Sequence, residues 1–207
     1  MYLRSNITRL LQYRSCLTKF QELGFETIYS YNLGLRVGVS AEQIRKDFSK
    51  FNIRGNKKAG YNIEEIIGAI NKIFNKTSPQ NVLLIGYGNL GQSLIKYKGF
   101  SRSMFHIKAA IDIDPSKHKR KTLVPVLPPE KALEIIKKNG IKIGIIAVPD
   151  IAAQEICNML VKAGIKGILN FSSLVLKAPE DVQINNINLG NELEAIYYHI
   201  QSKQKIK

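Results

Sequence analysis

Three glycines have a spacing that suits phosphate binding. They lie in the stretch GYGNLG, after an apolar run typical of a buried strand and before a helical pattern at residues 89–98. The first glycine allows a tight turn, the second lets a pyrophosphate approach the backbone, and the third lets the helix pack close to the strand. We therefore expect this loop to bind a dinucleotide, with a purely structural turn as the alternative. The loop residues expected to contact the ligand are Gly86, Tyr87, Gly88, Asn89, Leu90 and Gly91.

An acidic residue follows where the adenosine ribose of a dinucleotide would lie. Asp112 ends the next apolar run, about 20 residues after Gly91. A carboxylate there accepts hydrogen bonds from the ribose hydroxyls and repels a 2′-phosphate. The basic run at 117–121 would attract such a phosphate, although a solvated loop is the alternative for it. Because the fold fixes the position of Asp112, we expect NAD(H) rather than NADP(H).

A second group of residues suits contact with double-stranded DNA. Ser40 and Gln43 form a capping-box pattern at the start of a predicted helix with Ile44, Phe48 and Phe51 on one face. Basic side chains occupy its other faces, and a basic, hairpin-like loop follows at 52–61. In a winged helix-turn-helix such a helix enters the major groove, and the loop reaches the adjacent minor groove. A solvated helix face is the alternative. The expected contacts are Gln43, Arg45, Lys46, Ser49, Lys50, Lys57 and Lys58.

These two groups lie on opposite sides of a predicted domain boundary. The polar stretch NKTSPQ at 75–80 separates helical spacing from alternating strands and helices. Helices are predicted at 8–23, 30–36, 40–51 and 62–73, with Ser30 and Asn62 as candidate caps. After the boundary, strands are predicted at 82–86, 107–113, 143–148, 167–171 and 182–185, with helices near 89–98, 129–139 and 150–163.

The expected fold is therefore α/β overall. A winged helix-turn-helix DNA-binding domain at 1–78 precedes a Rossmann-type, doubly wound parallel sheet at 79–187. The segment 188–207 carries an apolar stripe at helical spacing and needs a surface to cover it, either its own domain or a partner subunit. The stripe consists of Leu189, Leu193, Ile196, Tyr197 and Ile200.

The charge of the chain favours a polyanionic partner. Its 207 residues include 31 Lys and Arg against 16 Asp and Glu, a net charge of +15 spread over both parts of the chain. Nucleic acid or a membrane surface would suit this charge, and a solubilising lysine-rich surface is the alternative. No apolar run approaches the roughly 20 residues of a membrane span, and the N-terminus lacks a signal-peptide pattern. We expect a cytoplasmic protein without membrane association.

No set of residues predicts catalysis or metal binding. His106, His118 and His199 form no constellation, and one dinucleotide fold accounts for the chain after the boundary. Cys16 and Cys157 are interpreted as buried small hydrophobes. A ligand-controlled DNA-binding protein is therefore favoured over an enzyme. A small NAD-dependent oxidoreductase and a DNA-binding dimer with a weak or lost redox response stay open as alternatives.

The chain resembles the Rex family of bacterial redox-sensing transcriptional repressors. The stretches VSAEQIRKDFSKF, AGY, GYGNLG, DIDP, AVP and AGIKGILNF stand in the family order over nearly the whole length. The resemblance implies a homodimer that binds an inverted-repeat operator, is released by NADH, and exchanges its C-terminal helix between protomers. It also implies that Arg45 and Lys46 form the basic pair of the recognition helix and that Lys57 enters the minor groove. Tyr97, Val148 and Pro149 would lie near the nicotinamide.

The sequence departs from the family pattern at the redox switch. In family members an arginine of the first helix pairs with an aspartate at the start of the exchanged helix. The matching positions here are Ser15 and Asn188, and Arg14 is one residue away on another helix face. Asn52 and Lys58 also replace wing glycines. The switch is therefore expected to work differently or weakly.

Overall fold

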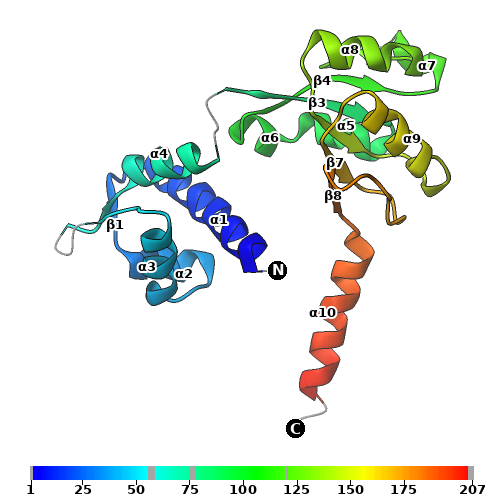
Figure 1. Ribbon diagram of the computed structural model, residues 1–207. Coiled ribbons are helices and arrows are strands. Elements are labelled where there is room, and N and C mark those ends of the chain that lie inside the picture. Colours follow the sequence, from blue (N-terminus) through cyan, green and yellow to red (C-terminus); the bar gives the residue numbers. More distant parts are fainter. Residues whose placement is uncertain (1, 56–58, 75–77, 120, 205–207) are drawn as a thin grey trace. The chain divides into compact units, whose positions relative to one another are not determined.

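The computed structural model describes residues 2–55, 59–74, 78–119 and 121–204, and their contacts divide the chain into units Met1–Ser78 and Pro79–Lys207. The division falls inside the polar stretch at 75–80. The described part of the first unit contains four helices and two short strands (Figure 1). They are α1 (Tyr2–Glu22), β1 (Thr27–Ile28), α2 (Ser30–Val37), α3 (Ala41–Lys50), β2 (Tyr61–Asn62) and α4 (Ile63–Ile73).

The first helix begins six residues earlier than its apolar spacing predicts. Asn6 and Arg9 lie near its start, and their polar side chains face the interior of the unit, where Arg9 binds a buried carboxylate of α3. Polar residues at inward positions hide the helical period from a search for apolar residues. The predicted ends of the helices near 40–51 and 62–73 agree with α3 and α4 within one residue.

The two short strands correct the predicted hairpin. Tyr61 and Asn62 of β2 pair antiparallel with Ile28 and Thr27 of β1, which precedes α2. The loop after α3 therefore returns to a strand from before the helix-turn-helix, and its own described residues 51–55 form no strand. Nearness in sequence suggested a local hairpin, whereas the paired backbone lies more than 30 residues away. Lys57 and Lys58 lie outside the described residues.

The second unit is built on one parallel sheet. Its six strands have the order β5-β4-β3-β6-β7-β8. In chain order this is 3-2-1-4-5-6, the doubly wound arrangement that binds a dinucleotide where the order reverses. The strands are β3 (Gln80–Ile85), β4 (Phe105–Ile111), β5 (Val126–Leu127), β6 (Ile143–Ile146), β7 (Gly167–Asn170) and β8 (Gln183–Asn186).

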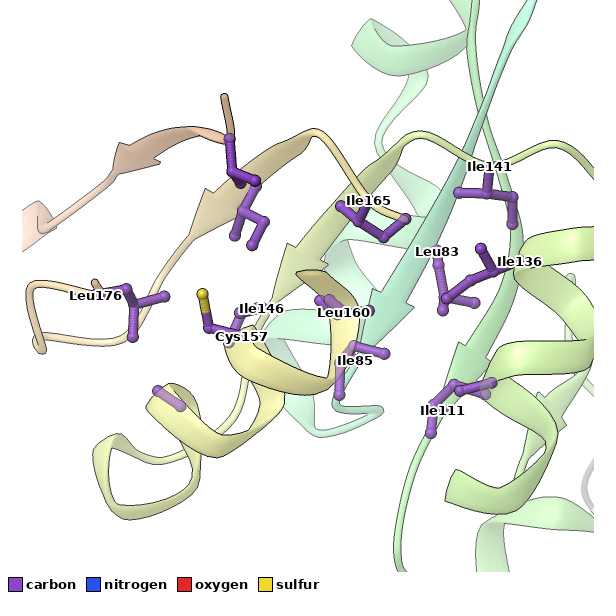
Figure 2. Packing of buried hydrophobic residues seen from close by; sticks show 14 of the residues in the cluster. Leu83, Ile85, Ile111, Ile136, Ile141, Ile146, Cys157, Leu160, Ile165 and Leu176 are labelled. Carbon is purple, nitrogen blue, oxygen red and sulfur yellow. The ribbon is translucent and has the colours of Figure 1, made fainter. Parts of the chain in front are cut away.

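Helices cover both faces of this sheet. On one face Leu83 and Ile85 pack with residues of α8 (Ala132–Lys138) and α9 (Asp150–Lys162), as Figure 2 shows. On the other face Val82 and Leu84 pack with residues of α5 (Asn89–Lys96) and α6 (Lys98–Arg102). Successive residues of β3 thus enter opposite cores, as the strand period requires. The fold confirms the predicted α/β class with a helical N-terminal unit and a parallel sheet.

Short elements account for the remaining differences from prediction. The predicted helix at 89–98 breaks at Tyr97, whose extended backbone separates α5 from α6. The helix predicted at 129–139 begins with a 3₁₀ turn, η1 (Pro129–Lys131). The strand β5 and the helix α7 (Pro115–His118) were not predicted, because two and four residues carry too little periodicity. The last helix, α10 (Leu189–Gln204), has its apolar stripe exposed.

Candidate nucleic-acid interface and dinucleotide cleft

The turn before α3 presents one helix face outward. Gly38 ends α2 with its backbone in the left-handed region. The Ser40 side chain accepts a hydrogen bond from the backbone amide of Gln43 at 3.1 Å. Ile44 and Phe48 are fully buried. The predicted split of this helix into buried and exposed faces is confirmed. The exposed set is Arg45, Lys46, Ser49 and Lys50.

The two basic residues of the predicted pair each have a partner within the unit. The Arg45 guanidinium donates to the Ser30 hydroxyl at 3.2 Å, and Lys46 pairs with Glu42 one turn earlier at 2.8 Å. Ser30 was predicted to cap α2, but it is the first helical residue, and Tyr29 precedes it without a side-chain cap. Its hydroxyl faces Arg45 instead, so α2 and α3 are joined at the exposed surface. Both partners are solvent-accessible, so Arg45 and Lys46 can turn to phosphates or bases at low cost.

A buried carboxylate that the sequence did not single out lies beneath this face. Asp47 is 3% exposed and accepts hydrogen bonds from four donor groups on three side chains. Arg9 provides two, at 2.7 Å each, while the Tyr13 hydroxyl and the Gln43 amide nitrogen provide one each at 2.8 Å. The Gln43 side chain therefore binds Asp47 rather than returning to Ser40 as a full capping box would. The only sequence signal was an Asp among basic residues.

These contacts keep the carboxylate ionised. Burial alone would raise the pKa of Asp47, but the hydrogen bonds from Arg9, Tyr13 and Gln43 lower it below its ordinary value. For Tyr13 burial acts together with the hydrogen bond to Asp47, and both raise the pKa of the phenol. Asp47 is therefore an anion at neutral pH and can only accept hydrogen bonds.

The glycine loop of the second unit has the predicted backbone geometry at Gly86 and Gly91. Gly86 follows β3 with φ of 100°, a conformation that favours glycine. A Cβ atom at Gly91 would collide with the carbonyl oxygen of Gly86, so the first turn of α5 needs glycine to lie against the loop. A Cβ atom at Gly88 would meet no protein atom within 4 Å. The backbone at Gly88 is thus open to a ligand beside the N-terminus of α5, where amide groups favour phosphate.

A cleft of about 290 Å³ opens at this loop, between the ends of β3, β4 and β6. Five of the predicted contact residues line it, namely Gly86, Gly88, Asp112, Val148 and Pro149. Tyr87, Asn89, Leu90 and Gly91 belong to the loop and helix beside it but do not line it. Tyr97 does not line it either, because it stands at the α5–α6 break, is 59% exposed, and packs edge-on against Phe100.

The carboxylate in the cleft is held mainly by backbone. Asp112 is 8% exposed and accepts from the amides of Tyr87 at 2.7 Å and Asp114 at 2.9 Å, and from the Lys117 ammonium at 2.9 Å. Burial would raise the pKa of Asp112, but these three hydrogen bonds lower it. Lys117, which lies in the basic run, also lines the cleft. The interpretation of that run as merely solvated is therefore wrong for Lys117.

The positions of the family charge pair have other roles in this chain. Ser15 is exposed on α1, and the Arg14 guanidinium beside it donates to Asn71 of α4 at 3.1 Å. The Asn188 side chain accepts from the Asn191 amide at 3.1 Å and so caps α10. Cys16 is only half-buried, contrary to prediction, because it borders a surface hollow between α1 and α2, whereas Cys157 is fully buried.

The described residues contain no cluster of three or more His, Cys, Asp or Glu side chains arranged to hold a metal ion. None of the helices within the described ranges is both long enough and apolar enough to span a membrane.

Two family models match the chain. One, described as a putative DNA-binding protein N-terminus, matches residues 4–49, and the other, described as a CoA binding domain, matches residues 77–174. The first match covers α1 to α3, and the second covers the sheet through β7.

Curated proteins and solved structures match nearly the whole length. The redox-sensing transcriptional repressor Rex of Desulforamulus reducens is 37% identical, over 97% of this chain and 96% of that protein. The Rex protein of Caldanaerobacter subterraneus subsp. tengcongensis is 39% identical, over 97% and 90%. RSP, in a crystal structure with β-NAD⁺ and operator DNA, has a TM-score of 0.88 at 35% identity, over 98% of this chain and 94% of that one. RSP with β-NADH has a TM-score of 0.84.

Proposed function

We propose that this protein, which belongs to the Rex family of redox-sensing transcriptional repressors, is a repressor whose affinity for operator DNA depends on the NADH/NAD⁺ ratio. The observation that carries the proposal is the presence of two sites in one chain. An exposed basic face on α3 suits DNA, and a glycine-loop cleft at the switch point of a parallel sheet suits NAD(H). The relative RSP has been crystallised with β-NAD⁺ and operator DNA, and with β-NADH.

The DNA contacts are assigned to the exposed face of α3. Arg45, Lys46, Ser49 and Lys50 would lie in the major groove with Gln43 at their edge, and Lys57 and Lys58 would extend the contact from the loop. The exposed stripe of α10 supports a homodimer, because five apolar side chains at least half exposed need a covering surface. A two-fold dimer would read an inverted repeat with one recognition helix per half-site.

The dinucleotide is proposed to regulate rather than to react. In the cleft Gly86, Gly88 and the α5 N-terminus would hold the pyrophosphate, and Val148 and Pro149 would face the nicotinamide side. Asp112 and Lys117 are the titratable groups among the lining residues, and they are paired with each other. NAD⁺ and NADH differ only at the nicotinamide, so a differential effect on DNA binding must arise there. Tyr97 and the start of α10 are the candidates for sensing it.

The test is fluorescence anisotropy with the full chain and a labelled inverted-repeat duplex at fixed salt, titrated with NADH at constant NAD⁺. Release by NADH but not by NAD⁺ is expected. Tight binding that ignores both nucleotides would leave a DNA-binding dimer without a switch. NADH oxidation with a panel of carbonyl substrates would instead indicate an oxidoreductase.

The missing charge pair gives a first prediction. Restoring it with Ser15→Arg and Asn188→Asp should strengthen the NADH response, because aspartate keeps the cap on α10 and gains an arginine partner. The NADH concentration that releases half of the duplex should fall roughly fivefold or more. Ser15→Arg alone is the control and should change it little. An unchanged double variant would mean that these positions do not pair.

A further inference from the structure

We infer that Gln43 reads an A·T pair in each operator half-site and that the buried Asp47 carboxylate sets the orientation in which the Gln43 amide is presented. This role rests on the proposed function, since it requires α3 to lie in the major groove. It adds a specificity-determining residue, Gln43, and a positioning residue, Asp47. Neither the exposed basic face nor the dinucleotide cleft accounts for this pair.

The orientation of the Gln43 amide follows from its contact with Asp47. A carboxylate only accepts hydrogen bonds, so the amide nitrogen of Gln43 must face it, as it does at 2.8 Å. The amide oxygen must then point away from the carboxylate. Among the described residues this oxygen accepts no hydrogen bond. The alternative orientation would place two oxygens together, with a negative charge on one of them.

The carboxylate is itself fixed by another helix. Arg9 binds both oxygens of Asp47, and Tyr13 binds one of them, so α1 provides three of the four hydrogen bonds. Asn6, also on α1, accepts a hydrogen bond from Arg9 and is 5% exposed. A network with this many partners leaves the carboxylate one arrangement. The direction of the Gln43 amide is thus determined by α1, not by α3 alone.

Gln43 occupies a suitable place on the recognition helix. It lies in the first turn of α3 and is half-buried, with its side chain at the boundary between core and solvent. Around the helix axis it is about 20° from Lys50 and about 60° from Lys46, at 100° per residue. Residues near the N-terminus of a recognition helix are those that contact base edges.

The groups that remain on Gln43 match adenine. The oxygen that faces away from Asp47 is an acceptor, and the amide nitrogen keeps one hydrogen that Asp47 does not accept. In the major groove adenine offers an amino donor at N6 next to an acceptor at N7, a pair that one amide satisfies with two hydrogen bonds. Cytosine offers only a donor, guanine offers two acceptors, and thymine offers one acceptor beside its methyl group. The acceptor-plus-donor edge of Gln43 therefore selects A·T.

The test selects binding sites from a pool of inverted-repeat duplexes with randomised half-sites, using the full-length protein. The wild type is expected to require A·T at one position that Gln43→Ala no longer requires, with preferences elsewhere unchanged. Discrimination at that position should fall roughly 5- to 150-fold. Replacing that adenine by purine, which lacks the 6-amino group, should weaken wild-type binding by a similar factor but leave Gln43→Ala binding unchanged.

Asp47→Asn tests the positioning role. An asparagine can accept from or donate to the Gln43 amide, so the same position should lose its preference although Gln43 is present. Asn71→Ala is the matched control, because it breaks a part-buried hydrogen bond between α1 and α4 without touching α3. That variant should keep the full preference. Near-ultraviolet circular dichroism establishes that each variant is folded.

Three results would overturn the inference in different ways. If Gln43→Ala selects the same sites as the wild type, Gln43 reads no base, although the proposed function stands. If folded Asp47→Asn keeps the full A·T preference, Asp47 does not orient Gln43. If the wild type enriches no sequence from the pool, sequence-specific DNA binding itself fails, and the role of Gln43 fails with it.

Discussion

The two units each contain a buried carboxylate held by several donors, but the donors differ in kind. Asp47 is bound only by side chains, two of them from α1 and more than 30 residues away. Asp112 is bound by two backbone amides and by Lys117, all within about 25 residues, and Tyr87 belongs to the glycine loop itself. The Asp47 carboxylate connects the buried side of α3 to α1. The other joins a ligand loop to the end of the neighbouring strand.

This difference determines how each site can be altered. A single substitution removes a side-chain donor, so the position of Asp47 depends on the side chains of Arg9 and Tyr13. Backbone donors persist whatever the side chain, so the position of Asp112 depends on the turn that Gly86 and Gly91 allow. The DNA-binding unit should therefore respond most to changes of charged partners, and the dinucleotide unit to changes at its glycines.

The largest effect is expected from Asp47→Ala, which removes the centre of the side-chain network. It removes the acceptor that the Arg9 guanidinium and the Tyr13 hydroxyl share beneath α3. The free energy of unfolding of the DNA-binding unit should fall by about 3–5 kcal/mol, as when one member of a buried ion pair is deleted. Urea denaturation of the full chain measures the loss. Asn71→Ala should cost about 1 kcal/mol. Equal losses in the two variants would mean that the network around Asp47 stabilises the unit no more than a single hydrogen bond does.

A pair of glycine substitutions addresses the second unit. Gly91→Ala forces a Cβ atom against the Gly86 carbonyl, so stability should fall by about 1–3 kcal/mol and NADH binding should weaken. Gly88→Ala meets no protein atom, so stability should stay near that of the wild type while NADH affinity falls, since the added methyl group occupies the proposed pyrophosphate position. Thermal unfolding with and without NADH separates the two. Unchanged NADH affinity in Gly88→Ala would move the ligand away from this loop.

The stability of the second unit should depend on pH through Asp112. Because the folded state lowers the pKa of this carboxyl, its stabilising contribution is present above the ordinary value near pH 4 and is lost as pH falls through the lowered pKa. Asp112→Asn should cost on the order of 1.5 kcal/mol at neutral pH. It should also reduce the loss of stability between about pH 5 and pH 3. If the pH profiles of variant and wild type were parallel, folding would not lower the pKa of Asp112.

The smallest effect on stability is expected from Lys46→Ala on the exposed face. Its pair with Glu42 is solvated at both ends, so the unfolding curve should not change. DNA affinity should fall, and the slope of its logarithm against the logarithm of salt concentration should decrease by about 0.9 if one phosphate contact is lost. An unchanged slope would remove Lys46 from the proposed interface.

Much of the architecture followed from local pattern. The apolar run of β3, the caps at Ser40 and Asn62, and the glycine spacing each depend on residues at most five apart, so the sequence alone predicted the strand, the helix starts and the loop. The exposed and buried faces of α3 followed from helical spacing for the same reason. The residues expected to touch DNA and NAD(H) stay predictions. Of those expected to contact the dinucleotide, five line the cleft, and Tyr87, Asn89, Leu90, Gly91 and Tyr97 do not.

Tertiary structure alone decided the contacts between distant residues. Nothing near Asp47 indicates that Arg9 and Tyr13 will bind it, and the inward polar residues of α1 obscured the start of that helix. The pairing of β1 with β2 likewise depends on where the chain returns. A sequence reveals spacing within an element because the backbone geometry is regular. It does not reveal which elements will contact each other, because those contacts depend on the packing of the whole core.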